Sequence, residues 1–241
     1  MKLLIDFGNT RVKVAASTSS GPELLYCGPA DLDDVLQAVH ACSPAGGIWC
    51  SVRPVSRQFE DWMLSLGMKR LSCATPIPLK VDYATPDTLG TDRLAAAVGA
   101  WSLKPGNDLL VIDAGTAITA EMVRADGTFA GGNIGPGIEM RLRSLHEHTG
   151  SLPLVDRHGE CPEFGFDTET AIRSGVLRGV RLEIEALVES TRREHGNLLV
   201  FLTGGDADCF DLKGKSGIFA VRNLVLQGLD CIEKYNENQD K

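Results

Sequence analysis

Two short turns in this sequence carry residue types that bind phosphate groups. The first turn, residues 6–10, begins with Asp6 and lies between the largely apolar runs 3–5 and 12–15. Asp6 is followed by a glycine that tolerates positive φ and by two small polar side chains. The N–H groups of such a turn can converge on one anion, and a carboxylate can hold the metal ion that accompanies a polyphosphate. The same residues also favour an ordinary tight turn, so this segment alone leaves both interpretations open.

A second turn repeats the pattern near the middle of the chain. The apolar run 109–112 ends in Asp113, with Gly115 and Thr116 two and three positions later. Asp113 lies 107 residues after Asp6, close to half of the 241-residue chain. Such an internal repeat predicts two similar α/β halves, each of which presents an Asp-x-Gly hairpin to a shared cleft. We therefore expect the two turns to hold the phosphates of a nucleotide from both sides.

An acidic residue also lies at the start of an alanine-rich helix, which residues 91–101 predict. The segment 90–93 reads Gly-Thr-Asp-Arg, so Asp92 falls in the first turn. Spacing alone favours a structural interpretation, in which Asp92 complements the helix dipole and Arg93 is its neighbour on the surface.

Three glycine-rich or capped segments introduce further elements of the second half. Residues 131–137 contain four glycines and lead into a helix over 138–148, whose first N–H groups suit an anion, although the segment also fits a flexible connector. The strand 198–202 is followed by Thr-Gly-Gly-Asp, which suits either a flat ring or ribose or a common strand-to-helix turn. The longest helix is predicted over 168–194, with Thr168 as its N-cap.

The remaining pattern alternates between strands and helices and therefore predicts mixed α/β sheets. Apolar periodicity predicts helices over 31–41, 56–66 and 220–235. A short buried strand is predicted over 48–52, and a three-stranded meander over 109–132. The proline-rich segment 74–88 is expected to be extended.

Composition excludes several classes of protein. The formal net charge of −8 argues against nucleic acid as the main partner. The seven cysteines include no C-x-x-C pair, so they indicate neither a zinc site nor a disulfide framework. No apolar run approaches the roughly 18 residues of a membrane span, and no secretory signal is visible. We therefore expect a cytoplasmic protein that binds neither nucleic acid nor membrane.

Five motifs, in this order along the chain, resemble those of one known family. They are Asp-x-Gly-Asn-Thr at 6–10, Gly-Thr-Asp-Arg at 90–93, Asp-Ala-Gly-Thr-Ala at 113–117, Gly-Gly…Pro-Gly at 131–137 and Thr-Gly-Gly at 203–205. Together they resemble the type III pantothenate kinases, which belong to the actin-like, sugar-kinase and Hsp70-type ATPase superfamily. The resemblance implies ATP-dependent phosphorylation of pantothenate to 4′-phosphopantothenate, the first step towards coenzyme A.

The same resemblance implies the architecture. We expect two duplicated, ribonuclease H-like (actin-like ATPase) domains, with mixed sheets flanked by helices. Residues 1–108 would carry the first phosphate hairpin and the acceptor motif, and residues 109–241 the second hairpin and the nucleoside-side loops. A homodimer is also implied. The long predicted helix supports it loosely, because Gly175 and Gly179 are spaced to let another backbone come close.

Roles for individual residues follow from the resemblance as well. The ATP phosphates would be bound by Asp6, Phe7, Gly8, Asn9, Thr10, Arg11, Val12 and Lys13. Asp6 would lie near Mg²⁺, Asp113 would hold a monovalent cation, K⁺ or NH₄⁺, and Thr116 would contact ATP. Pantothenate would be contacted by Tyr83, Gly90, Thr91, Asp92, Arg93 and Thr168. Asp92 would be the general base, which replaces the helix-dipole interpretation, whereas Arg93 would either bind the substrate carboxylate or hold Asp92.

Three other functions remain open at this stage. The chain could be another small-molecule kinase or a phosphatase of the same superfamily. It could be a regulatory accessory factor that shares the fold. An actin-like assembly protein is the third possibility, but those proteins generally need a longer chain with inserted subdomains.

Overall fold

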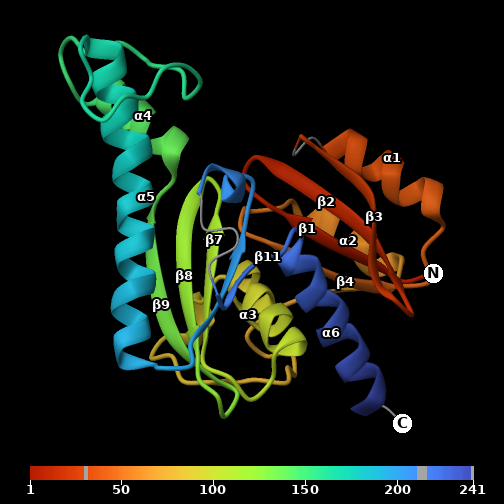
Figure 1. The fold of residues 1–241 in the computed structure, drawn as a ribbon. Coiled ribbons are helices and arrows are strands. Elements are labelled where there is room, and N and C mark those ends of the chain that lie inside the picture. The colour runs from red at the N-terminus through yellow and green to blue at the C-terminus, as the bar shows by residue number, and fades with distance from the viewer. Residues whose placement is uncertain (30–31, 211–215, 240–241) are drawn as a thin grey trace. The chain divides into compact units, whose positions relative to one another are not determined.

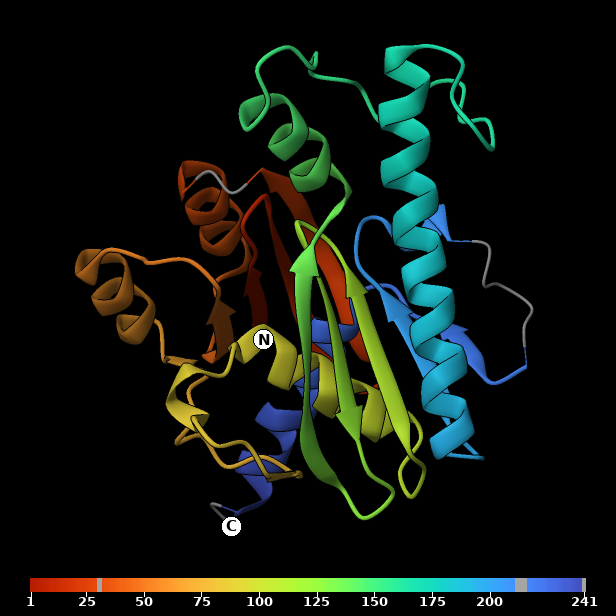
Figure 2. The same cartoon turned by 90° about the vertical axis from the view of Figure 1, so that its left-hand side faces the viewer.

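The computed structural model describes residues 1–29, 32–210 and 216–239 (Figures 1 and 2). The chain forms two compact units. The first consists of Met1–Asn107, Glu121–Gly131 and Asn223–Lys241, and the second of Asp108–Ala120 and Gly132–Arg222. No described helix combines the length and the apolar character that a membrane span needs.

A five-stranded mixed sheet is the centre of the first unit, with the strand order β3-β2-β1-β4-β5. Its strands are β1 (Leu3–Phe7), β2 (Arg11–Thr18), β3 (Gly21–Pro29), β4 (Gly47–Ser51) and β5 (Met68–Arg70). Strands β1, β2 and β3 form an antiparallel meander, whereas β4 and β5 continue the sheet in parallel with β1. The predicted first hairpin is therefore confirmed as β1 and β2.

One face of β1 packs against two helices, because alternate side chains of a strand point to the same side. Leu3, Ile5 and Phe7 pack in a buried cluster with residues of two helices. These are α1 (Leu32–Cys42) and α2 (Arg57–Ser65). The predicted N-cap of α2 is confirmed, since the Ser56 hydroxyl accepts a hydrogen bond from the backbone of the third helical residue.

Helices α3 (Thr91–Leu103) and α6 (Leu224–Gln239) cross closely within the first unit. A Cβ on Gly228 would overlap the carbonyl oxygen of Ala95, so the crossing requires glycine. This contact places the C-terminal helix in the first unit, although the sequence predicted consecutive halves.

The second sheet has six strands in the order β11-β10-β7-β8-β9-β6. They are β6 (Lys80–Val81), β7 (Leu109–Ala114), β8 (Ala117–Val123), β9 (Thr128–Pro136), β10 (Leu199–Thr203) and β11 (Ile218–Ala220). Strand β10 pairs in parallel with both β7 and β11. The predicted meander over 109–132 is confirmed as β7, β8 and β9.

Two helices and two short 3₁₀ turns complete the described elements. The helices α4 (Ile138–Glu147) and α5 (Thr168–Glu194) lie in the second unit and contact each other. The 3₁₀ turns are η1 (Pro86–Thr88) and η2 (Ala207–Cys209). Figure 1 shows α5 as the longest helix, and its buried positions Val176, Val180, Ile184 and Val188 recur at helical spacing.

Two predictions about element boundaries were wrong. Residues 131–136, expected as a connector or anion-binding loop, continue strand β9. The last helix, expected from residue 220, begins at Leu224 instead, and Ala220 is the last residue of β11. At 131–136 the preceding strand simply continues, and at 218–220 the chain pairs with another strand. Both arrangements outweigh the local sequence pattern.

Candidate active site

The first hairpin turn is closed by a backbone hydrogen bond from Gly8 to the carbonyl of Arg11, 3.0 Å long. Gly8 does not have the positive φ that the sequence suggested. Glycine is required for another reason: a Cβ there would lie 2.8 Å from the carbonyl oxygen of Arg11. Asn9, Thr10 and Arg11 are exposed at the tip, where an anion can reach them.

Asp6 is the centre of a row of polar side chains across three strands. Its neighbour on β2 is Lys13, and its neighbour on β4 is Cys50. Paired residues of neighbouring strands point to the same face, so all three side chains share one side of the sheet. The Cys50 thiol is fully buried and donates to Oδ1 of Asp6 over 3.7 Å. Burial, and then the carboxylates of Asp6 and Asp92, raise the pKa of Cys50 well above its usual value, so the thiol stays protonated.

Asp92 belongs to the same neighbourhood, because its charge acts on the Cys50 thiol. It lies in the first turn of α3, and Gly90 is the N-cap of that helix. A Cβ on Gly90 would lie 2.6 Å from Oδ1 of Asp92, so glycine lets this carboxylate fold back over the helix start. Burial raises the pKa of Asp92 above its ordinary value, even though backbone N–H groups and Arg93 favour its charged form. A carboxylate with a raised pKa is a stronger proton acceptor.

Arg93 is buried rather than on the surface, which corrects the first interpretation of its position. Its Nε donates to Oε1 of Glu121 over 2.7 Å, and only 5% of Arg93 and none of Glu121 is exposed. The Tyr83 side chain also hydrogen-bonds to the guanidinium, and its ring packs edge-on against Phe129. The ion-pair partner of Arg93 is therefore Glu121 and not Asp92.

The second Asp-x-Gly turn is enclosed by the backbone of two other segments of its unit. Asp113 is the register partner of Thr203 on β10. The next residue, Gly204, has φ +97°, and a Cβ there would lie 2.5 Å from Oδ1 of Asp113. On the other side, the N–H of Gly137 donates to the carbonyl of Thr116 over 3.0 Å. The Thr-Gly-Gly and Pro-Gly motifs thus lie directly against the Asp113 turn.

Thr168 begins α5, but it does not cap the helix as predicted. Asp167 is the N-cap: its Oδ1 accepts from the backbone N–H of Thr170 over 2.8 Å, and the Thr170 hydroxyl accepts in turn from the N–H of Asp167. This reciprocal capping box leaves the Thr168 side chain exposed and available to a ligand.

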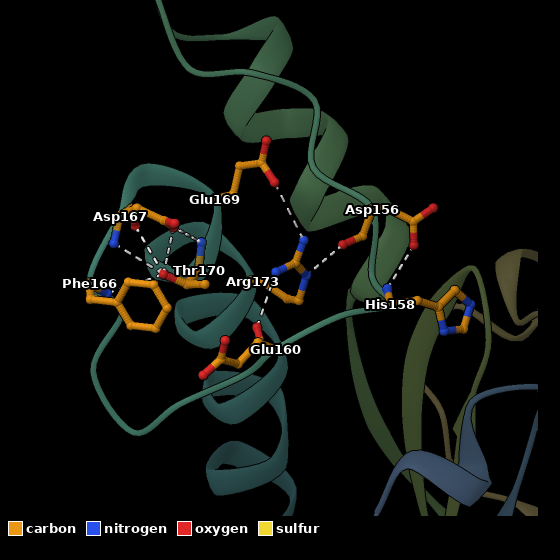
Figure 3. A network of polar contacts seen from close by, with 8 residues as sticks. All are labelled: Asp156, His158, Glu160, Phe166, Asp167, Glu169, Thr170 and Arg173. Carbon is orange, nitrogen blue, oxygen red and sulfur yellow. Dashed lines mark hydrogen bonds and ion pairs between the residues drawn. The ribbon is translucent and has the colours of Figure 1, made fainter.

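The loop before α5 is tied to the helix by a buried arginine (Figure 3). Arg173 donates from Nε to the carbonyl of Asp156 over 2.8 Å and from Nη1 to that of Glu160 over 3.0 Å. The capping box thus fixes the start of α5, and Arg173 ties the segment 156–160 to the same helix.

A sequence model of one family matches residues 2–190, and its description is type III pantothenate kinase. The chain belongs to the type III pantothenate kinase family. Two curated relatives with that name agree. One from Bacteroides fragilis is 44% identical and covers 99% of this chain and 100% of its own length. Another, from Porphyromonas gingivalis, is 42% identical over 97% of this chain and 98% of its own.

Solved structures share the fold of this family member. A Campylobacter jejuni protein assigned to the Baf family of transcriptional activators aligns with a TM-score of 0.64 at 21% identity, over 98% of this chain and 99% of that one. MreB 5 of Spiroplasma citri, bound to AMPPNP, aligns with a TM-score of 0.52 at 12% identity, over 100% and 98% of the two chains. At such identities the likeness concerns the fold alone. The predicted fold class is confirmed.

Sequence reasoning about this type III pantothenate kinase missed two residues beside the candidate site, Cys50 and Glu121. Cys50 lies in a short apolar strand, and nothing in its sequence neighbours marks it as a partner of Asp6. Glu121 is a single acidic residue in the apolar strand β8. A buried carboxylate needs a cationic or hydrogen-bonding partner, so its place in a buried strand could have indicated one. That the Asp6 and Asp113 turns face each other stays a prediction, because the two turns belong to different units.

Proposed function

We propose that this protein transfers the γ-phosphoryl group of ATP to the primary hydroxyl of pantothenate, which yields 4′-phosphopantothenate for coenzyme A biosynthesis. Membership of the type III pantothenate kinase family supports the reaction class. The observation that carries the proposal is the position of Asp92, a carboxylate of raised pKa in the same neighbourhood as Asp6. Such a transfer needs one acidic group beside the acceptor hydroxyl and another that binds the metal ion with the phosphates.

Asp92 is the general base in this proposal. It accepts the proton of the pantothenate hydroxyl as the oxygen attacks the γ-phosphorus. Phosphoryl transfer needs alignment and charge stabilisation more than covalent help, so a well-placed carboxylate is sufficient. Gly90 supports this role because it leaves room for the carboxylate above the helix start.

The phosphates of ATP bind the first turn and the strand that follows, residues 6–13, and Thr116 of the second turn contacts ATP. Lys13 supplies positive charge next to Asp6. The described residues contain no group of three His, Cys, Asp or Glu side chains that could hold a metal ion by themselves. Mg²⁺ fits this donor set, because it commonly binds through one or two carboxylates plus substrate phosphates. Asp6 would hold it, and the ion would neutralise developing charge on the phosphoryl oxygens.

Asp113 would hold a monovalent cation, K⁺ or NH₄⁺. The carbonyl oxygen of Ala114 accepts from the N–H of Asp206 over 2.9 Å, so the backbone around this carboxylate is fixed by the Thr-Gly-Gly turn. Oxygen ligands on a rigid backbone suit a hard cation.

Pantothenate contacts Tyr83, the helix start Gly90–Arg93 and Thr168 in this proposal. Tyr83, Asp92 and Arg93 support it by lying together in the first unit: Tyr83 hydrogen-bonds to Arg93, which is the sequence neighbour of Asp92. Thr168 supports it by its exposure on a fixed helix start.

We also infer a homodimer in the cytoplasm. On α5, the Cβ positions of Gly175 and Gly179 have no described atom within 4 Å. Leu182 on the same helix and Phe166 just before it are 58% and 70% exposed, and a second copy could cover both. The seven cysteines are all free thiols, as in a reducing compartment. Light scattering on a sizing column should give twice the chain mass of 25.9 kDa, and a fully active monomer would contradict the dimer.

The proposed reaction is tested by coupled ADP release with pantothenate, ATP and Mg²⁺. The wild-type protein should turn over pantothenate and not a simple sugar, and Asp92→Asn should lower kcat by about 1,000-fold or more while nucleotide still binds. Near-normal kcat in this variant would exclude Asp92 as the base.

The raised pKa of Asp92 also predicts how activity and stability depend on pH. The acid limb of kcat/KM should lie above the ordinary pKa of an aspartate, because burial raises the pKa of Asp92. The folded state then keeps the proton to higher pH than the unfolded chain, so stability falls as pH rises through the folded pKa. Asp92→Asn should remove that loss, which a melting series against pH would reveal.

A further inference from the structure

Cys50 is a buried polar group in the first unit to which the proposed reaction gives no task. It lies on β4, where it is the register partner of Asp6 on β1, and it is 0% exposed. A buried free cysteine often serves only as a small apolar residue. The surroundings of Cys50 give its thiol a polar partner instead.

The sheet separates Cys50 from the apolar cluster of this unit. Its chain neighbour Trp49 belongs to the cluster that packs with α1 and α2. Because side chains alternate along a strand, Cys50 points to the opposite face, which it shares with Asp6. Helix α3, which carries Asp92 in its first turn, also contacts β4. The thiol is therefore on the side of the sheet that carries the proposed metal ligand.

One hydrogen bond joins the two side chains. The Cys50 thiol donates to Oδ1 of Asp6, with 3.7 Å between sulfur and oxygen. A thiol is a weak donor, but a hydrogen bond is stronger when its acceptor is a carboxylate. Both residues lie on paired strands, so the register of the sheet keeps them together. Cys50 thus contacts one of the two oxygens of the Asp6 carboxylate directly.

The direction of a carboxylate decides where it can place a metal ion. The last torsion of an aspartate side chain is broad, so an unrestrained carboxylate samples many directions. A hydrogen bond to Oδ1 restricts this rotation and thereby sets the direction of the other oxygen. Mg²⁺ demands near-ideal octahedral geometry, so a carboxylate held in one direction suits it better than one that rotates.

We propose that Cys50 is a positioning residue, whose thiol holds Oδ1 of Asp6 so that the carboxylate is turned to bind the Mg²⁺ of the nucleotide. This inference rests on the proposed function and deepens it, because it names a residue that sets how strongly nucleotide binding depends on Mg²⁺. Cys50 acts only through Asp6 and does not itself contact the ion, the nucleotide or the acceptor.

The test measures the binding of a non-hydrolysable ATP analogue by calorimetry, without acceptor, in Mg²⁺ and in EDTA. In Mg²⁺, Cys50→Ala should weaken binding by about 3- to 10-fold, since one hydrogen bond that orients the metal ligand is lost. In EDTA, the same substitution should change binding by less than about twofold, because Asp6 then has no ion to hold.

Two further comparisons separate positioning from packing. Ile48→Val is the matched control, because Ile48 is 1% exposed and lies two positions before Cys50, on the same face of β4. It should lower the melting temperature and leave binding unchanged in both conditions. In an Asp6→Asn background, Cys50→Ala should weaken binding in Mg²⁺ by less than about twofold, because a residue that acts through Asp6 loses its effect there.

The infrared S–H stretch tests the contact with Cys50 in place. A hydrogen-bonded thiol absorbs at a lower frequency than one without an acceptor, so the band should move to higher frequency in Asp6→Ala. The other thiols keep their surroundings and cancel in the difference spectrum between wild type and variant. This measurement does not require Cys50→Ala to fold.

The inference is overturned if Cys50→Ala weakens binding equally in Mg²⁺ and in EDTA, or leaves it unchanged in both. An S–H band that does not move in Asp6→Ala would also overturn it. Failure of wild-type protein to phosphorylate pantothenate is a separate result, which would contradict the proposed function. The two failures are distinguishable because the binding and infrared measurements contain no acceptor.

Discussion

The two Asp-x-Gly hairpins have the same sequence pattern but different surroundings. The Asp6 turn, between β1 and β2, has an exposed tip, and its shape depends on its own bond from Gly8 to Arg11. The Asp113 turn is held by hydrogen bonds from two other segments, at Gly137 and Asp206. The first turn is thus closed by its own backbone, whereas the second is braced by the backbone of two other segments.

The residues next to the two aspartates also differ. Asp6 lies between a lysine and a buried thiol on one face of its sheet. Asp113 lies against Thr203 and the glycine that follows it. In our proposal the first environment holds a metal–phosphate group, and the second holds a small ion. A duplicated motif therefore does not imply a duplicated role, because the packed neighbours decide what each copy can bind.

The largest expected effect comes from Asp6→Asn, which tests the first hairpin. This change removes the proposed Mg²⁺ carboxylate but keeps the shape of the side chain, so kcat should fall by about 1,000-fold. Steady-state ADP release over a Mg²⁺ titration measures it. Activity within tenfold of wild type at all Mg²⁺ concentrations would exclude Asp6 as the metal ligand.

A substitution at Gly204 tests how tightly the second hairpin is enclosed. Gly204→Ala places a Cβ against the carbonyl of Ala114 at a φ of +97°, so it should lower the free energy of unfolding by about 3 kcal/mol. Gly205→Ala is the control, since no atom lies within 4 Å of its Cβ position and its φ is ordinary. Denaturant melts of the two variants measure the difference, and equal stabilities would show that this turn is not enclosed.

The smallest effect is expected for Asp113→Asn, which tests whether the second hairpin holds a monovalent ion. The variant should lose about tenfold in kcat/KM at saturating K⁺, because one carboxylate–cation contact is weakened. Its activity should also no longer respond to K⁺, and that response is the measurement. A wild-type K⁺ response in Asp113→Asn would place the ion elsewhere.

Local sequence determined much of this protein. Each Asp-x-Gly hairpin follows from an apolar run, a glycine and a returning strand, and adjacent residues are enough to specify such a unit. The start of α3 follows in the same way from its alanine-rich composition, and this places Asp92 and Arg93 in one turn. The cap of α5 was predicted one residue too late, because Asp167 and Thr168 are both good capping residues and only the bond to Thr170 distinguishes them.

Tertiary structure alone decided the environment of these groups. Arg93 was expected on the surface, yet it pairs with Glu121, which is 28 positions away in the chain. Cys50 lies beside Asp6 only because β4 pairs in parallel with β1. Burial raises the pKa of Asp92, and burial depends on what packs against a residue. Spacing along the chain carries little information about that, so sequence specified the reactive groups and the fold set their charge, orientation and partners.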